Sequence, residues 1–313
     1  MGLHGSATCV MRFDEARSWI VGDAGRGLNA MFAMMNAARL HVALQGIGLL
    51  DAAWQKADAY SRERREMRAP GRGKSAAQAD LIAEHPAMRR ILDTQRAWID
   101  GGRVLAYRTA VELDMVKHHP DAARREAAQR WCSLVTPVIK AAFTQQAFYG
   151  GSECLQVFGG HAYVREWGVE QNVRDARVAM IYEGTNEIQA IDLLVRKILP
   201  DGGVMFFGWL DTLRTNLDPG QAPDARVLDH LAALEVHTRQ LVTAAASQEK
   251  GVRSFVIASN RKIVAIRFFC PLQSKHSRNQ PSYLRQMASN NGVRARHPER
   301  ITFPKTHFLN YHM

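Results

Sequence analysis

The sequence has few cysteines, no long apolar run and no leader-like start. Its four cysteines are scattered and form no Cys-x-x-Cys pair, so neither a zinc site nor a disulfide framework is expected. No stretch of 18 apolar residues occurs, which excludes a helix that spans a membrane. Residues 1–6 lack a basic region followed by an apolar one, so a secretory signal is not indicated. These absences favour the reducing cytoplasm. The cysteines are Cys9, Cys132, Cys154 and Cys270.

Acidic residues are almost missing from residues 251–313. This segment holds 11 Lys and Arg against one acid, Glu299, and so carries +10 of the formal net charge of +11. Residues 1–250 are therefore close to neutral. Four prolines interrupt the segment and no helical period persists in it. We expect a basic tail that is disordered or is out-of-frame coding sequence. The alternative is a nucleic-acid or anionic-surface binder acting through this tail, with nucleic acid the less favoured partner.

Most of residues 27–198 follow the period of an amphipathic helix. A first, largely apolar helix is expected from Gly27 to about Arg65, followed by a basic loop at 66–80. A second begins near Pro86 and ends at His118-His119-Pro120, and a third runs from Asp121 to the Gly159-Gly160 pair. Thr185 or Asn186 caps the last helix. Long helices with few strands predict an all-α fold, an antiparallel four-helix bundle.

Two short segments carry most of the chemistry, and each also has a purely structural reading. Glu183 follows an apolar approach and precedes a glycine turn, where desolvation could make its carboxylate a base, although an acid at a helix entry also suits the helix dipole. Gly159 and Gly160 permit close approach of a ligand or simply end a helix.

Two arginines are also candidates for anion recognition. Arg39 lies inside the apolar first helix, where it needs either an anionic ligand or an internal salt bridge. Arg64 lies in a charge run that could equally be a solvated face. The pair His118-His119 has no ligand partners at metal-binding spacing, so no metal is assigned.

In combination, these segments resemble the acyl-CoA dehydrogenase family. The resemblance covers about residues 10–200. It indicates the branch of larger acyl-CoA dehydrogenases that includes the 3-methylmercaptopropionyl-CoA dehydrogenase type. The segments that carry it are Met-Asn-x-x-Arg-Leu at 35–40, Arg-Glu-Arg at 62–64, Gln-Val-Phe-Gly-Gly-His-x-Tyr at 156–163, Arg-Asp-Ala at 174–176 and Ile-Tyr-Glu-Gly-Thr-Asn at 181–186.

The resemblance implies an FAD-dependent α,β-dehydrogenation of acyl-CoA thioesters. Glu183 matches the base that removes the α-proton while the β-hydrogen passes as hydride to flavin N5. Acyl-CoA is the implied substrate, electron-transfer flavoprotein the implied acceptor, and a homodimer or homotetramer the implied assembly. The implied cofactor residues are Arg64, Gln156, Gly159, Gly160, Thr185 and Glu187, and the implied substrate residues are Asn36, Arg39, Tyr182 and Gly184.

The same resemblance predicts the domain organisation. Residues 1–25 match the end of the family's middle β-domain, 26–200 its C-terminal helical bundle, and 201–250 the start of a helical extension. The chain is then a C-terminal fragment that is not expected to be active alone. A helical bundle that only oligomerises remains an alternative.

Overall fold

The structure, a computed structural model, describes residues 1–7, 9–71 and 78–246. These residues form seven α-helices and several short 3-10 or π segments, and their only β-type pairing is a single bridge between Arg65 and Leu81. The all-α prediction is therefore confirmed. The proposed tail at 251–313 lies outside the described residues.

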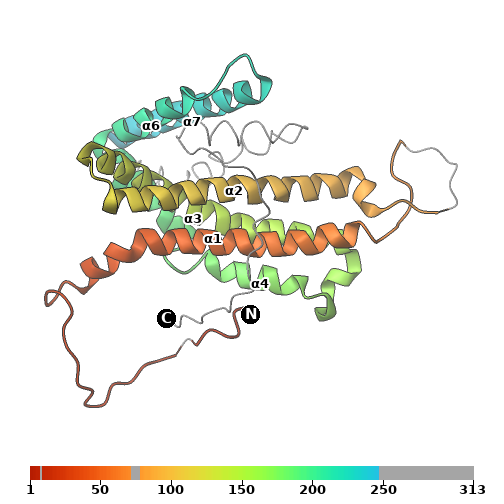
Figure 1. Cartoon of the computed structure of the whole chain (residues 1–313), viewed down its shortest axis with the longest axis horizontal. Helices are drawn as coiled ribbons and strands as arrows, with labels where there is room; N and C mark the ends of the chain where they lie inside the picture. Colours follow the sequence, from red (N-terminus) through yellow and green to blue (C-terminus); the bar gives the residue numbers. More distant parts are fainter. Residues whose placement is uncertain (8, 72–77, 247–313) are drawn as a thin grey trace. The chain divides into compact units, whose positions relative to one another are not determined.

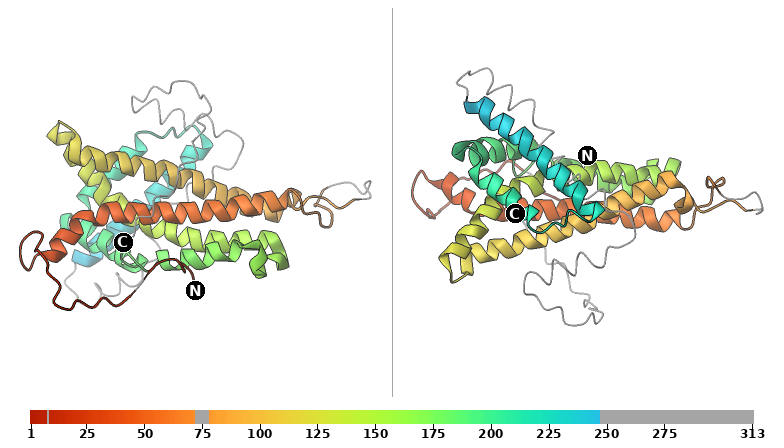
Figure 2. Two further views of the ribbon diagram at one scale, coloured as in Figure 1. Left: turned by 60° about the horizontal axis from the view of Figure 1, so that its bottom comes forward. Right: turned by 90° about the horizontal axis from the view of Figure 1, so that it is seen from above.

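Three long helices and one short helix make the bundle. They are α1 (Gly27–Ser61), α2 (Pro86–His118), α3 (Ala122–Phe158) and α4 (Val169–Ala179). Helices α1 and α3 run parallel, since Asn36 contacts Thr136 near one end and Tyr60 stacks on Phe158 at the other. Helix α2 runs against both and α4 returns beside them, so successive helices alternate in direction (Figures 1 and 2).

Local sequence sets where these helices begin and end. Pro86 opens α2, which stops at His118 because His119, the residue before Pro120, has extended backbone. The Asp121 side chain accepts a hydrogen bond from Ala123 N and caps α3. Helix α3 continues through Pro137 and ends at Gly159, whose φ is +57°. The expected helix boundaries therefore have direct physical causes.

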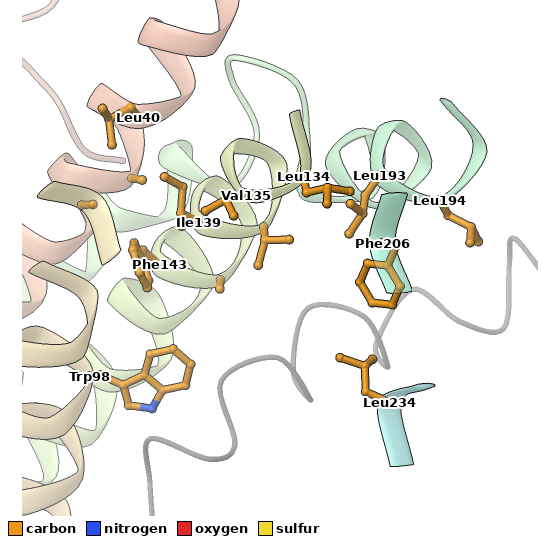
Figure 3. Close-up of a cluster of buried hydrophobic side chains, with 14 of the residues drawn as sticks. Leu40, Trp98, Leu134, Val135, Ile139, Phe143, Leu193, Leu194, Phe206 and Leu234 are labelled. Atoms are coloured by element: carbon orange, nitrogen blue, oxygen red, sulfur yellow. The ribbon is translucent and has the colours of Figure 1, made fainter. Parts of the chain in front are cut away.

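One apolar core joins the bundle to the helices that follow it. Leu40 of α1, Trp98 of α2 and Phe143 of α3 belong to this core (Figure 3). It extends through Leu193 of the π-helical turn Asp192–Ile198 to Phe206 of α6 (Val204–Arg214). Helix α7 (Ala222–Ala246) adds further leucines. The extension at 201–246 is thus helical and shares the core of the bundle.

The structure differs from the expected elements in two places. Between Gly159 and Ala179, where the sequence pattern predicts no element, the chain forms 3-10 turns at Gly159–Tyr163 and Arg165–Trp167 and the helix α4. The expected last helix is α5 (Asn186–Ile191), followed by the π-helical turn and a 3-10 turn at Leu199–Asp201. Residues 1–7 and 9–25 form no strand or helix, and their assignment to a β-domain stays a prediction.

Candidate active site

The candidate base Glu183 lies in a turn of unusual backbone conformation. Glu183 has φ +53° and Gly184 has φ +81°, so two successive residues are left-handed. Such a conformation is rare for a residue with a side chain and needs support from its surroundings. A side chain at residue 184 would be strained at φ +81°, and its Cβ would lie 2.8 Å from Gln189 Nε2, so glycine is favoured there. Thr185 then caps α5 by accepting a hydrogen bond from Ile188 N, as expected.

Side chains next to this turn fix it by hydrogen bonds, one to helix α1 and others to the backbone of the turn itself. The Tyr182 hydroxyl donates a hydrogen bond to Gln45 Oε1 of α1. Burial raises the pKa of Tyr182, Gln45 opposes that shift, and the nearby Glu183 adds to it. The buried Gln189 amide donates from Nε2 to the carbonyls of Glu183 and Gly184, at 3.0 and 3.2 Å. The turn is therefore held through the carbonyl of Glu183 and the carbonyl of Gly184.

A buried lysine that the sequence reading missed also contacts this turn. Lys140 of α3 is 0% exposed, and its Nζ donates to the Gly184 carbonyl at 2.6 Å and to Asn186 Oδ1 at 3.1 Å. The pKa of Lys140 is lowered to about 8, chiefly by burial and secondly by the charge of Arg39, with Glu183 and Glu187 opposing the shift. The sequence does contain a signal, since Lys140 is the only charged residue between Trp131 and Ser152.

Arg39 forms a buried ion pair within the chain. Its Nη1 donates to Asp192 Oδ2 at 2.7 Å, and both side chains are less than a tenth exposed. Of the two readings of Arg39, the structure contains the internal salt bridge. Asn36, one helical turn earlier, is half-buried, and its Oδ1 accepts a hydrogen bond from Thr136. Glu187, on the first turn of α5, is exposed.

The remaining candidates lie at the other end of α1 and α3. Arg64 and Gln156 are exposed, as are Gly159 and Gly160, and no atom lies within 4 Å of a Cβ built on either glycine. Beside them the Tyr60 ring stacks on Phe158 with ring centres 4.5 Å apart, and its hydroxyl hydrogen-bonds with His161 Nδ1.

The structure therefore divides the predicted site residues into two groups. The base-end group is Asn36, Arg39, Tyr182, Glu183, Gly184, Thr185 and Glu187, and the glycine-end group is Arg64, Gln156, Gly159 and Gly160. Lys140 contacts the first group and Phe158 borders the second. At 1.5 Å per residue, roughly 27 Å of helix α3 separates them. One chain does not bring the two groups together.

The described residues contain neither a metal-binding cluster nor a helix suited to crossing a membrane. Among residues 1–7, 9–71 and 78–246, no cluster of three or more His, Cys, Asp or Glu side chains could hold a metal ion. None of the helices in the same ranges is both long and apolar enough to cross a membrane.

Comparison with known proteins identifies the family to which this bundle and its two groups of polar residues belong. The model of the acyl-CoA dehydrogenase C-terminal domain matches residues 25–198. The chain belongs to the acyl-CoA dehydrogenase family.

Curated relatives agree with this assignment. The chain is 40% identical over 235 residues to 3-methylmercaptopropionyl-CoA dehydrogenase of Ruegeria pomeroyi, covering 74% of this chain and 40% of that protein. It is 35% identical over 213 residues to the broad-specificity linear acyl-CoA dehydrogenase FadE5 of Mycobacterium tuberculosis, covering 65% and 34% of the two proteins. The chain thus spans less than half the length of these relatives.

Solved structures share the fold at lower identity. Caenorhabditis elegans ACDH-11, solved in complex with C11-CoA, superposes with a TM-score of 0.62 at 23% identity, over 83% of this chain and 43% of that one. Arabidopsis thaliana acyl-CoA oxidase 1 gives a TM-score of 0.63 at 17% identity, over 82% and 40%. At these identities the likeness supports the helical fold alone.

Proposed function

We propose that the chain is the part of an acyl-CoA dehydrogenase that supplies the catalytic base, Glu183. The observation that carries the proposal is the left-handed turn at Glu183 and Gly184, whose carbonyls are held by Gln189 and Lys140. A base fixed by its backbone and half-removed from water is suited to abstracting a weakly acidic proton. The Glu183 carboxylate takes the α-proton of the thioester, and a carbon–carbon double bond forms as the β-hydrogen leaves.

The neighbours of Glu183 are suited to holding the acyl thioester. Tyr182 and Gly184 flank the base, and Asn36 lies on the adjacent face of α1 near Arg39. The Arg39 guanidinium is already paired with Asp192, so it acts by shaping this part of the bundle and by its positive field. The substrate class is acyl-CoA, as the names of the curated relatives suggest.

The glycine-end group fits the cofactor FAD. The exposed Arg64 guanidinium can pair with a pyrophosphate in bidentate fashion. Gly159 and Gly160 have open surfaces that allow close backbone approach of a ring, and Gln156 offers an amide beside them. Thr185 and Glu187 are the candidate cofactor residues of the base-end group. When bound, the flavin supplies the acceptor for the hydride that leaves the β-carbon.

The distance between the two groups supports a homodimer or homotetramer. A flavin contacted by both groups needs the glycine-end group of one copy beside the base-end group of another, as a symmetric assembly allows. Electron-transfer flavoprotein as the acceptor and the cytoplasm as the location complete the proposal. The chain alone is not expected to turn over substrate, because it matches no more than 40% of the length of these curated relatives.

The base assignment is tested in a chimaera. Residues 25–313 replace the matching C-terminal part of the Ruegeria relative, and Glu183→Gln is compared with the parent chimaera. Because a general base contributes roughly 100- to 10,000-fold, we expect acyl-CoA dehydrogenation by Glu183→Gln to fall at least 100-fold with flavin content unchanged. Glu126→Gln, which alters an exposed glutamate on α3, is the control. Turnover by Glu183→Gln at the parent rate would contradict the assignment.

A further inference from the structure

Lys140 is the least expected charge in the described part of the chain. Its side chain is fully buried on α3, yet no carboxylate among the described residues lies within ion-pairing distance of its Nζ. A buried ammonium without a carboxylate partner is unfavourable unless oriented dipoles replace its water. The dipoles that replace the water belong to the Gly184 carbonyl and to the Asn186 side chain. Lys140 therefore spends its hydrogen bonds on the turn that carries Glu183.

Three residues of α3, namely Lys140, Ala141 and Thr144, form hydrogen bonds with the turn or with Asn186 just after it. Asn186 Oδ1 accepts from Lys140 and from Thr144 Oγ1, and Asn186 Nδ2 donates to the Ala141 carbonyl. The Gly184 carbonyl accepts from Lys140 at 2.6 Å. Of these contacts, only those of Lys140 reach both the backbone of residue 184 and the first residue of α5. Its removal therefore leaves the Gly184 carbonyl with no hydrogen bond to α3, while Asn186 keeps its contacts with Ala141 and Thr144.

The turn needs such an anchor because of its backbone. Glu183 at φ +53° occupies a left-handed region that a residue with a Cβ enters only with backbone strain. Gln189 holds the Glu183 and Gly184 carbonyls from α5, the helix into which the turn leads. Lys140 belongs to the long helix α3, whose side chains form part of the core. Lys140 therefore ties the turn to a different element of the bundle, whereas Gln189 ties it to the segment that follows.

We propose that Lys140 is a positioning residue for Glu183, whose ammonium group anchors the Glu183–Gly184 turn to helix α3 and so fixes where the carboxylate lies. Its importance for the reaction rests on the proposed function, but the anchoring itself does not. Lys140 does not touch the acyl-CoA and transfers no proton.

The anchoring is tested in the full chain by amide hydrogen exchange. Lys140→Met keeps the length and volume of the side chain and removes the charge and the donors. We expect exchange in peptides covering 180–189 to accelerate at least tenfold, while peptides from α2 stay as in the parent. The matched control is Lys56→Met, because Lys56 Nζ also donates to a glycine carbonyl, Gly168 O at 3.0 Å, and to an asparagine, Asn172 Oδ1 at 3.4 Å. Unchanged exchange at 180–189 in a folded Lys140→Met overturns the proposal.

A second measurement needs no variant and applies even if Lys140→Met fails to fold. Because the pKa of Lys140 lies at about 8, its ammonium loses its charge between pH 7 and pH 9.5. We expect the protection factor of the turn amides to fall severalfold over this range, and the protection of α2 to stay constant. The charged groups that face Lys140 are Arg39 of α1, Glu183 and Glu187, with Asp192 on the far side of Arg39. Constant protection of the turn through pH 9.5 overturns the proposal.

The consequence for catalysis is read in the chimaera. We expect Lys140→Met to lower kcat at least tenfold and to leave KM for acyl-CoA within threefold, because the base is misplaced but the substrate is still held. Lys56→Met should leave both values unchanged. Loss of binding with kcat intact would make Lys140 a substrate residue and overturn the proposal. If exchange accelerates in Lys140→Met while Glu183→Gln remains active, the anchor stands and the base assignment fails.

Discussion

At the scale of single residues, Arg39 and Lys140 show two ways of stabilising a buried cation. Arg39 is paired with a carboxylate, whereas Lys140 is held by a carbonyl and an amide. The sequence predicts that Arg39 needs an anion but leaves open whether that anion is internal, because Asp192 lies 153 positions away. Lys140 was missed because one polar residue in a helix does not disturb the helical period. Its isolation in an uncharged stretch is the signal to use.

The Arg39–Asp192 pair predicts a large difference between single and double substitutions. Arg39→Met leaves the Asp192 carboxylate buried with only Arg196 at 3.6 Å, and breaking such a pair costs about 3–5 kcal/mol in unfolding free energy. The double variant Arg39→Met, Asp192→Leu should lose much less, because both charges are gone. Urea denaturation of the parent, the single variant and the double variant measures the three unfolding free energies.

An exposed pair provides the control for this comparison. Arg62 and Asp58 are 2.9 Å apart at i and i+4, with Arg62 mostly exposed, and Arg62→Met should cost less than about 1 kcal/mol. If Arg39→Met lost no more than Arg62→Met, the buried pair would not be a stabilising element of this site.

At the scale of elements, the close approach of α1 to α3 depends on small residues. A Cβ at Gly46 would lie 2.8 Å from the Phe143 carbonyl oxygen, so the two backbones are nearly in contact there. Gly48, two residues further along the same helix, has no atom within 4 Å of the same position. The close contact between the two helices therefore lies at Gly46 and not at Gly48.

These two glycines predict opposite effects of one substitution. Gly46→Ala should destabilise the chain by roughly 1–3 kcal/mol, because a backbone contact must open. Gly48→Ala should stabilise it by about 0.5–1 kcal/mol, because alanine favours the helix and meets nothing. Thermal unfolding of the two variants distinguishes them, and equal shifts in Tm of the same sign would contradict the close helix contact.

The long helices could be predicted from the sequence, and the short ones could not. Helices α1, α2 and α3 each exceed 30 residues, so their apolar positions recur over many turns, and Pro86, Asp121 and Gly159 mark three of their ends. Helix α4 has only 11 residues and buries Val169, Ala176 and Ala179, so few apolar positions mark it along the sequence. The π-helical turn after α5 has only 7 residues. That is too few for its sequence pattern to be distinguished from the pattern of an α-helix.

At the scale of the whole molecule, the division of the site into two groups predicts complementation between copies. In the chimaera, Glu183→Gln damages the base-end group and Arg64→Glu damages the glycine-end group. When the two inactive proteins are mixed and allowed to exchange subunits, half of the dimers are mixed and each contains one intact site. Activity should then return to about a quarter of the parent value. An activity no higher than the sum of the two variants would show that both groups serve the same site within one copy.

The parallel course of α1 and α3 has an electrical consequence. Helices α1 and α3 both end beside Tyr60 and Phe158, so the partial negative charges of their carbonyl ends lie there, next to the positive amino ends of the antiparallel helices α2 and α4. Three arginines, Arg62, Arg64 and Arg65, follow directly after α1 at this end. Their positive charges are favourable beside the carbonyl ends of α1 and α3. An anion that approaches this end of the bundle therefore meets guanidinium groups before it meets the helix carbonyls.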